Sequence, residues 1–277
     1  MRCRICGSEN NAETISVREM MIPTRERFDY FTCLNCNCLQ IKDIPCKLSA
    51  YYGNEYYSFD GAEDAPTETP VSDNTPILDV GCGSGKFLKK LRESGYGNLR
   101  GCDPFLPQDI FYGKEIKIWK KTIHEIEGQF EQIYMNDSFE HMCDPHEVMD
   151  SVHRLLTDKG MARIKIPIYP NIAFDLYGEH WYQIDAPRHI FLHSRKSMEI
   201  LTAMHNLRIV EVTYDSDSSQ IFRSFLYSKD IPFWEQSMSM IRETMDNNEI
   251  DEISRLTQEA NEKQYGDHAV FYIVKDV

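Results

Sequence analysis

From residue 77 onward, the pattern of apolar and polar positions predicts strands and helices that follow one another in turn. Short apolar runs, each suited to a buried strand, lie at 77–80, 99–102, 115–119, 130–135, 161–166, 207–214 and 269–274. Between several of these runs, apolar residues recur at helical spacing, at 84–94, 144–160 and 194–205. Strands alternating with helices predict an α/β fold built on a parallel sheet.

The helix after the fourth strand has a distinct start signal. Asp144 stands at the N-cap position, Pro145 at the first helical position and Glu147 two residues later, which forms a capping box. Apolar residues then keep the helical period, and Gly160 is expected to end the helix.

Changes in composition predict three parts of the chain. Residues 1–50 carry paired cysteines and form a first small unit. Residues 51–76 form a tyrosine-rich segment that continues into an acidic linker rich in Pro, Thr and Asp. Residues 77–277 hold the α/β domain, with a helical insertion at about 220–265.

Two Cys-x-x-Cys pairs mark the first unit, and a strand-like stretch at 28–31 precedes the second pair. Their spacing is typical of a zinc ribbon, in which four thiolates complete a tetrahedral zinc site and hold together a segment too small for its own core. Iron–sulfur or redox use, or cysteines without metal, are alternatives, and Cys38 or Cys46 could replace a ligand. The candidate ligands are Cys3, Cys6, Cys33 and Cys36.

A glycine-rich turn follows the first predicted strand and reads Asp-x-Gly-x-Gly-x-Gly over 79–85. A phosphate-binding P-loop would need a glycine at Val80 and a hydroxyl at Phe87, and a dinucleotide fold would need a glycine at Lys86. A strand–turn–helix without a ligand is the other alternative. Three closely spaced glycines cost backbone entropy that a plain connection does not require, which favours a ligand site.

This turn resembles motif I of class I S-adenosylmethionine-dependent methyltransferases. The resemblance implies S-adenosylmethionine as cofactor and a Rossmann-like, seven-stranded, mostly parallel sheet whose last strand inserts antiparallel beside the fifth. Asp103, at the end of the second strand, is placed to accept hydrogen bonds from ribose hydroxyls, or else is an ordinary turn aspartate.

Other candidate cofactor contacts lie near the carboxyl ends of the predicted strands. Residues 120–127 would pass over the adenine ring, and the end of the fourth strand would lie near the methionine part of the cofactor. The candidate cofactor-binding residues are Asp79, Gly81, Cys82, Gly83, Gly85, Asp103, Pro104, Ile123, Asn136 and Asp137.

Two histidines are candidate general bases for deprotonating a methyl acceptor. His141 follows Glu140 directly after the fourth strand, and imidazole is the side chain best suited to this task near pH 7. His189 lies in a long excursion at 167–193, and its neighbour Arg188 could hold an anionic substrate group. His141 could instead only pack at the helix entry.

The tyrosine-rich segment gives candidate substrate contacts. Its rings could pack the first unit against the next domain, or form a lid that offers rings and hydroxyls to a substrate. The tyrosines concerned are Tyr51, Tyr52, Tyr56 and Tyr57.

A closer resemblance covers most of residues 1–214. The ribbon, the tyrosine segment, the Glu-His pair and the Asp-x-Pro-Arg-His sequence at 185–189 are similar to a methyltransferase branch acting on nucleotide-linked deoxysugars and on polysaccharide or natural-product intermediates. In its sugar C-methyltransferases the resemblance implies that Glu140 and His141 act at the substrate. Those enzymes carry a further C-terminal domain, where this chain has the helical insertion, so O- or N-methylation is equally open.

Charge and composition narrow the partners. A net charge of −14 argues against a nucleic acid as the main ligand. No apolar run is long enough to span a membrane and no signal peptide is evident, so we expect a cytoplasmic protein with nine reduced or metal-bound cysteines. The sequence predicts a methyltransferase for a small polar acceptor such as a sugar nucleotide. The alternative is a non-catalytic cofactor- or partner-binding module recruited through the ribbon.

Overall fold

The computed structural model describes residues 1–52 and 70–276, so Tyr56 and Tyr57 of the predicted substrate segment lie outside the described residues. The chain separates into two compact units, each described by itself. Unit 1 comprises Met1–Gly53, Ile166–Ile200 and Val212–Val270, and unit 2 comprises Asn54–Lys165, Leu201–Glu211 and Phe271–Val277. The domain boundaries expected from composition stay a prediction.

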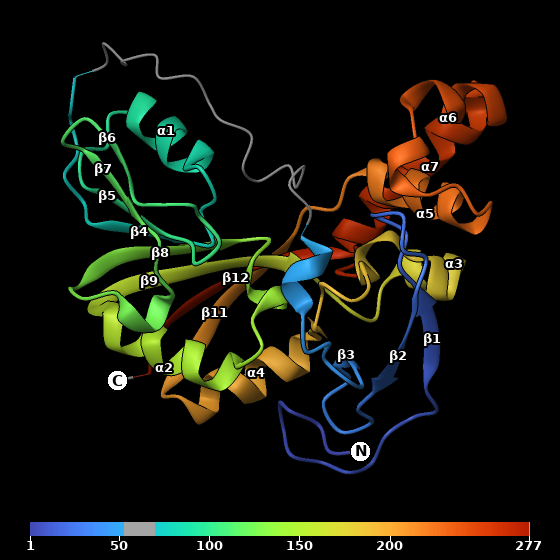
Figure 1. Cartoon of the computed structure of the whole chain (residues 1–277), viewed down its shortest axis with the longest axis horizontal. Coiled ribbons are helices and arrows are strands. Elements are labelled where there is room, and N and C mark those ends of the chain that lie inside the picture. Colours follow the sequence, from blue (N-terminus) through green and yellow to red (C-terminus); the bar gives the residue numbers. More distant parts are fainter. Residues whose placement is uncertain (53–69, 277) are drawn as a thin grey trace. The chain divides into compact units, whose positions relative to one another are not determined.

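Most of unit 2 is built on an eight-stranded sheet with the strand order β11-β12-β9-β8-β4-β5-β7-β6 (Figure 1). Its strands are β4 (Ile77–Val80), β5 (Leu99–Cys102), β6 (Ile110–Tyr112), β7 (Ile116–Trp119), β8 (Phe130–Asn136), β9 (Leu156–Pro167), β11 (Leu207–Tyr214) and β12 (His268–Lys275). The last strand lies beside β9, the fifth of the predicted strands, as expected.

The predicted count of seven strands is wrong by one. The additional strand, β6, pairs antiparallel with β7 at the edge of the sheet. A strand of three residues is too short to show a recognisable alternation of apolar and polar positions in the sequence. The strand β6 is recognised only because it pairs with β7 in the structure. All seven predicted strands are present, with shifts of their ends.

Helices lie on both faces of this sheet, α1 (Lys86–Glu93) on one and α2 (Pro145–Leu155) on the other (Figure 1). Short 3₁₀ turns, η3 (Ile123–Glu125) and η4 (Phe139–His141), lie between the strands. Beneath α1, an apolar cluster gathers buried residues from three strands and the helix, among them Ile77, Leu88, Leu99, Ile116 and Ile118.

The N-cap and the first residue of α2 are as predicted, but only one half of the predicted capping box is found among the described residues, and the helix ends elsewhere. Asp144 caps the helix and accepts a hydrogen bond from the Glu147 N–H at 3.5 Å. The helix ends at Leu155 rather than near Gly160, because Leu156 already pairs with β8. A register irregularity follows in β9, and a Cβ at Gly160 would lie 2.9 Å from the Phe130 carbonyl oxygen. Strand pairing at this bulge therefore overrides the helical period.

Unit 1 contains a four-stranded sheet in the order β1-β2-β3-β10, with antiparallel pairing throughout. The strands are β1 (Ile15–Arg18), β2 (Arg27–Thr32), β3 (Leu39–Ile41) and β10 (Phe191–Leu192). The predicted strand at 28–31 is therefore confirmed within β2. Because β10 comes from the excursion at 167–193, that excursion completes the N-terminal sheet.

Helices make up much of the rest of unit 1. They are η1 (Leu48–Tyr51), α3 (Ile172–Tyr177), η5 (Gly178–His180), η6 (Tyr182–Ile184), α5 (Ser218–Ser228), η7 (Phe233–Glu235), α6 (Met238–Thr244) and α7 (Asn247–Glu262), while α4 (Arg195–Met204) runs from unit 1 into unit 2. Helices α5, α6 and α7 thus lie in the stretch where the sequence predicts a helical insertion, and the first of them begins at Ser218. Among the described residues, no helix combines the length and apolarity needed to cross a membrane.

Candidate cofactor, catalytic and metal sites

The glycine-rich turn joins β4 to α1, and its three glycines adopt left-handed backbone conformations. The φ angles are 72° at Gly81, 51° at Gly83 and 84° at Gly85. A Cβ at Gly81 would lie 2.5 Å from the Cβ of Ser138, whose hydroxyl donates a hydrogen bond to the Val80 carbonyl at 2.8 Å. The turn therefore requires glycine both for conformation and for its close approach to the end of β8.

The position of β4 in the sheet explains why the candidate cofactor residues gather. β4 pairs in parallel with β5 on one side and with β8 on the other, so the strand order reverses at β4. In open α/β sheets, such a switch point leaves a crevice at the carboxyl ends of the strands, where ligands bind. The glycine turn, Asp103 and Asn136 all lie at these ends.

Asp103 faces the glycine turn. Its carboxylate accepts hydrogen bonds from the Gly83 N–H at 3.0 Å and the Phe105 N–H at 2.9 Å, one on each oxygen. Burial raises the pKa of Asp103, which is only 6% exposed. Each oxygen accepts one of these two bonds and has a second acceptor site, so the carboxylate can also accept from hydroxyl groups of a ligand.

Asp79 is a second buried acid, in β4 just before the turn. Burial, and secondarily the charge of Asp103, raise the pKa of Asp79 to about 8. The hydrogen bonds found within the described part of the chain include none to its carboxylate. A cation brought close to Asp79 would favour the ionised form and lower this pKa. The two acids therefore suit a ligand that carries both hydroxyls and positive charge.

The end of β8 contributes further polar groups. The Asn136 Nδ2 atom is buried and has no hydrogen-bond partner among the described residues, so it can serve a ligand acceptor. Asp137 follows with a left-handed φ of 51°, a conformation that is sparsely populated for residues other than glycine.

The remaining predicted cofactor residues are placed as follows. Cys82 is half-buried within the turn, and its thiol donates to the Gly83 carbonyl at 3.5 Å. Ile123 is 3% exposed in η3, while Pro104 is exposed beside Asp103. All three belong to unit 2, like the rest of the predicted cofactor set.

The predicted Glu-His pair lies in η4 of unit 2. Glu140 is fully buried, and its Oε1 lies 4.0 Å from Nε2 of the half-buried His141. The carboxylate can therefore stabilise a protonated imidazole at His141.

His189 lies in unit 1, and its tautomer follows from its contacts. Its Nδ1 is 2.7 Å from the Gln183 carbonyl oxygen, which only accepts hydrogen bonds, so Nδ1 carries the proton in the neutral ring. Nε2 then holds the lone pair and lies 3.8 Å from Oδ2 of Asp185. The ring is thus set to accept a proton at Nε2 beside a carboxylate that stabilises the resulting charge.

Arg188 is buried and held by acidic side chains. Its guanidinium donates to Asp185 and to Glu19, the latter at 3.1 Å, and to the Tyr51 carbonyl at 3.0 Å. Burial alone would lower the pKa of Arg188, but these carboxylates raise it. The predicted contact of Arg188 with an anionic substrate group stays a prediction. Of the predicted substrate tyrosines, Tyr51 donates to Glu26 at 2.8 Å and Tyr52 is half-buried.

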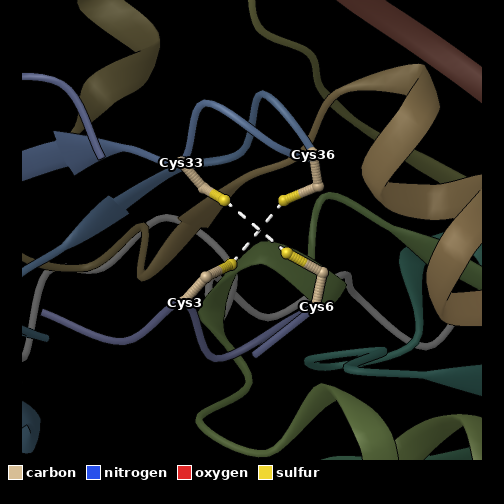
Figure 2. A group of neighbouring side chains, drawn as sticks. All are labelled: Cys3, Cys6, Cys33 and Cys36. Atoms are coloured by element: carbon tan, nitrogen blue, oxygen red, sulfur yellow. Dashed lines mark hydrogen bonds between the residues drawn. The ribbon is translucent and has the colours of Figure 1, made fainter. Parts of the chain in front are cut away.

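The four predicted cysteine ligands converge in unit 1 with their sulfur atoms facing one centre (Figure 2). Cys3 lies 3.6 Å from Cys36, Cys6 lies 3.6 Å from Cys33, and all four sulfurs are within 4.8 Å of one another. A tetrahedral zinc with 2.3 Å bonds sets its sulfur atoms about 3.8 Å apart, so this geometry fits zinc. Iron–sulfur sites also use cysteine sets.

Hydrogen bonds to the sulfurs reinforce this fit. Gln40 Nε2 donates to Cys3 Sγ at 3.2 Å, and Asn35 Nδ2 donates to Cys6 Sγ at 3.4 Å. Such donors stabilise thiolate ligands. The hydrogen bond from Cys36 lowers the pKa of Cys3 to about 4. Cys38 is buried and Cys46 exposed, and neither belongs to the converging group.

Three residues with roles in these sites carried no signal in the sequence. Glu19 binds Arg188, Tyr30 donates to the His189 carbonyl at 2.9 Å, and Gln40 contacts Cys3. All three are fully buried polar residues of the N-terminal segment. A lone polar residue within or beside a short strand is usually solvent-exposed, so no pattern marked them.

A family comparison adds independent information. The model of a protein family described as a methyltransferase domain matches residues 59–212. A search among curated proteins found no match to the chain.

Solved structures resemble the chain over about three quarters of its length. A chain in the complex of the Haloferax volcanii Trm112 methyltransferase activator with a methyltransferase is 15% identical, covers 76% of this chain and 85% of its own, and has a TM-score of 0.49. Phosphoethanolamine N-methyltransferase 2 of Haemonchus contortus is 15% identical over 75% of this chain and 50% of its own, with a TM-score of 0.45. A cyclopropane synthase of Mycobacterium tuberculosis is 14% identical over 76% and 80%, also with a TM-score of 0.45. At these identities the similarities carry no information on the substrate.

Proposed function

Because this chain belongs to the methyltransferase domain family and is an S-adenosylmethionine-dependent enzyme, we propose that it methylates a small polar acceptor of the sugar-nucleotide class. The cofactor, when bound, supplies an electrophilic methyl group on a sulfonium. The enzyme's own tasks are to bind the cofactor, orient the acceptor and remove its proton where the chemistry requires it.

The observation that carries the cofactor assignment is the constellation at the switch point. Gly83 and Asp103 are joined by a hydrogen bond at 3.0 Å, and the carboxylate is placed to receive ribose hydroxyls. Asp79 suits the positive charge of the methionine part, and the buried Asn136 Nδ2 suits its carboxylate. Ile123 offers an apolar surface for the adenine.

For the general base we propose His189, with Asp185 stabilising its protonated form. The support is the tautomer, because Nδ1 is committed to the Gln183 carbonyl and Nε2 is left as the acceptor. His141, backed by Glu140 at 4.0 Å, is the second candidate. Arg188 and the tyrosines Tyr51 and Tyr52 belong to the same proposal as candidate substrate contacts.

We further propose that Cys3, Cys6, Cys33 and Cys36 bind one structural zinc as a ribbon. Four cysteines that converge within 4.8 Å leave no open position for a substrate, which is typical of structural rather than catalytic zinc. Metal analysis of the purified protein should find about one zinc per chain. Iron, or no metal, would contradict this assignment. None of the nine cysteines forms a disulfide, which supports a reducing, cytoplasmic location.

Ligand-induced thermal shift tests the cofactor. We expect S-adenosylmethionine and S-adenosylhomocysteine to stabilise the protein and NAD to leave it unchanged. Stabilisation by NAD alone would overturn the proposal. Transfer of a labelled methyl group to a panel of nucleotide-linked sugars then tests the acceptor. Cofactor binding without transfer to any polar acceptor would favour the non-catalytic binding module.

The two base candidates separate by substitution. With an acceptor from that panel, we expect His189→Ala to lower turnover about 10²- to 10⁴-fold and to leave cofactor affinity unchanged. His141→Ala should have the smaller effect. The opposite ranking would assign the base to His141.

A further inference from the structure

We propose that the N-terminal cysteine module, residues 1–52, positions His189, with Tyr30 and Glu19 as its positioning residues. The inference rests on the proposed role of His189 as the base. The N-terminal segment would then support catalysis by positioning the base, instead of recruiting a partner protein. Every contact in the argument lies within unit 1.

The backbone next to His189 is held by β3. The Ile41 N–H donates to the Ile190 carbonyl at 3.0 Å, and β10 then pairs with β3 at Phe191 and Leu192. The pairing with β3 therefore begins at the Ile190 carbonyl, directly after His189, and continues through β10. The main chain that follows His189 is fixed by this pairing.

Tyr30 fixes the main chain of His189 itself. Its hydroxyl donates to the His189 carbonyl at 2.9 Å, and the side chain has no exposed surface. Burial raises the pKa of Tyr30 well above its usual value, so the hydroxyl stays protonated and remains a donor at neutral pH. This is a side-chain bond from β2 to a carbonyl 159 residues away in sequence.

Glu19 fixes the carboxylate that faces His189. Glu19 Oε1 accepts from the Met21 and Ile22 N–H groups at 2.7 Å, which holds the acid rigidly at the end of β1. The same oxygen accepts from Arg188 at 3.1 Å, and Arg188 donates to Asp185 at 2.9 Å and 2.5 Å.

Asp185 closes this chain of contacts at His189. Its Oδ2 lies 3.8 Å from His189 Nε2, and its carbonyl accepts from the Arg188 and His189 N–H groups. The linked side chains of Glu19 and Arg188, both fully buried, and of the partly buried Asp185 thus set the charge beside the imidazole. Breaking this chain of contacts at Glu19 would leave Arg188 to redistribute its bonds and would move Asp185 relative to Nε2.

The cysteine cluster is connected to the same segment at two points. Gln40, which donates to Cys3 Sγ, lies in β3 directly opposite Phe191. Ser194, just after β10, donates to the Cys36 carbonyl at 2.5 Å. Zinc bound to the four cysteines should therefore restrain the backbone of β3 and of the end of β10. Because these strands flank His189, the metal should also restrain His189.

The test follows His189 directly and needs no acceptor. In isotope-labelled protein, Tyr30→Phe should raise amide exchange of residues 188–190 and 41 about tenfold, because one buried carbonyl loses its donor. Glu19→Gln should shift the titration midpoint of the His189 imidazole measured by NMR, whereas the tautomer, held by the Gln183 carbonyl, should not change. Tyr265→Phe is the matched control, since it removes a 2.9 Å hydroxyl bond to Asp175 elsewhere in unit 1.

Zinc removal from the full-length protein by a chelator supplies the second arm. We expect faster exchange across β3, β10 and residues 188–190, with unchanged exchange in β4, β5 and β8. Unchanged exchange of residues 188–190 in Tyr30→Phe, together with an unshifted His189 titration in Glu19→Gln, would overturn the positioning role. An effect of Tyr265→Phe at His189 equal to that of Tyr30→Phe would do the same.

These readouts also separate this inference from the proposed function. Affinity for S-adenosylmethionine, measured by calorimetry, reports on unit 2 and should not change in Tyr30→Phe. If His189→Ala kept full turnover, the proposed base would be wrong while the exchange and titration results would still decide whether the module holds this segment. Where an acceptor is in hand, Glu19→Gln should shift the pH profile of kcat more than KM.

Discussion

The glycine turn in unit 2 and the His189 segment in unit 1 both contain buried acids, but only those near His189 are paired with a cationic side chain. At the turn, Asp79 and Asp103 are two acids without a cationic side chain bound to them in the described structure, and the pKa of both is raised. Around His189, the acids Glu19 and Asp185 share the buried cation of Arg188. In our proposal a cationic ligand supplies the charge that the first region lacks, whereas in the second region the cation is the protein's own Arg188.

The two regions also differ in how the sequence encodes them. The turn is one continuous stretch, followed about 20 residues later by its partner acid. The His189 segment depends on Glu19 and Tyr30, which precede it by more than 150 residues and are joined to it by side-chain bonds. Substitutions should therefore act locally and on affinity in the first region, and at a distance and on structure in the second.

The largest expected effect is on unit 1. Cys33→Ser removes one of the four proposed zinc ligands. Because metal binding in structural zinc sites supplies folding free energy of about 10 kcal/mol, we expect most of the stability of the N-terminal sheet to be lost. Zinc content and exchange protection in β1–β3 measure this. Affinity for S-adenosylmethionine should fall far less. If Cys33→Ser reduced exchange protection in unit 1 and cofactor affinity equally, the two units would not be independent as this comparison requires. Cys46→Ser, at an exposed thiol outside the group, is the control.

The next effect is confined to unit 2. Gly81→Val would place a Cβ 2.5 Å from Ser138 Cβ at a φ of 72°, so the turn must move away from β8. Cofactor binding should then fall below detection in calorimetry, while zinc content is retained. Gly128→Ala is the matched control, because it has a φ of 108° but its nearest neighbour lies 4.0 Å away. It should cost about 1 kcal/mol of stability and leave affinity intact.

A smaller effect is expected at the ribose position. Asp103→Ala removes the carboxylate that accepts from the Gly83 N–H and that we propose as the ribose ligand, and we expect affinity for S-adenosylmethionine to fall about 10- to 100-fold. Calorimetry with S-adenosylhomocysteine should show the same factor, since the two ligands share the ribose. An unchanged affinity would take Asp103 out of the cofactor site and leave its bonds to Gly83 and Phe105 as its role.

A pH dependence is also expected at Asp79. With a pKa raised to about 8, the folded carboxyl holds its proton where the unfolded one, with a pKa of about 3.9, has lost it. The free energy of unfolding of the cofactor-free unit should therefore decrease as pH rises from about 4 to about 8. Affinity for the cationic cofactor should increase from pH 6 to pH 8, with release of a proton on binding.

Asp79→Asn should abolish both trends at Asp79. Calorimetry in buffers of different ionisation enthalpy measures the released proton. If wild-type binding released none over this interval, the cofactor's positive charge would not lie near Asp79.

Most of what local pattern could show was predicted. The sheet strands, the cap at Asp144 and the glycine turn each depend on residues within one short window, and the methyltransferase assignment followed from the turn. The misses are also informative. The helix was extended to Gly160 because its period continues, whereas pairing of Leu156 with Phe130 starts a strand there. The spacing of apolar residues along one segment carries no information about a neighbouring strand that competes for the same residues.

The sequence alone thus determined the cofactor turn, the strand–helix alternation and the four converging cysteines, because each is written in spacing along the chain. Only the tertiary structure showed that the excursion returns to complete the N-terminal sheet, or that Glu19 and Tyr30 hold the surroundings of His189. The physical reason is that one buried hydrogen bond or ion pair between distant residues needs no repeated pattern. It depends on where the backbone brings two side chains together, and that is a property of the fold.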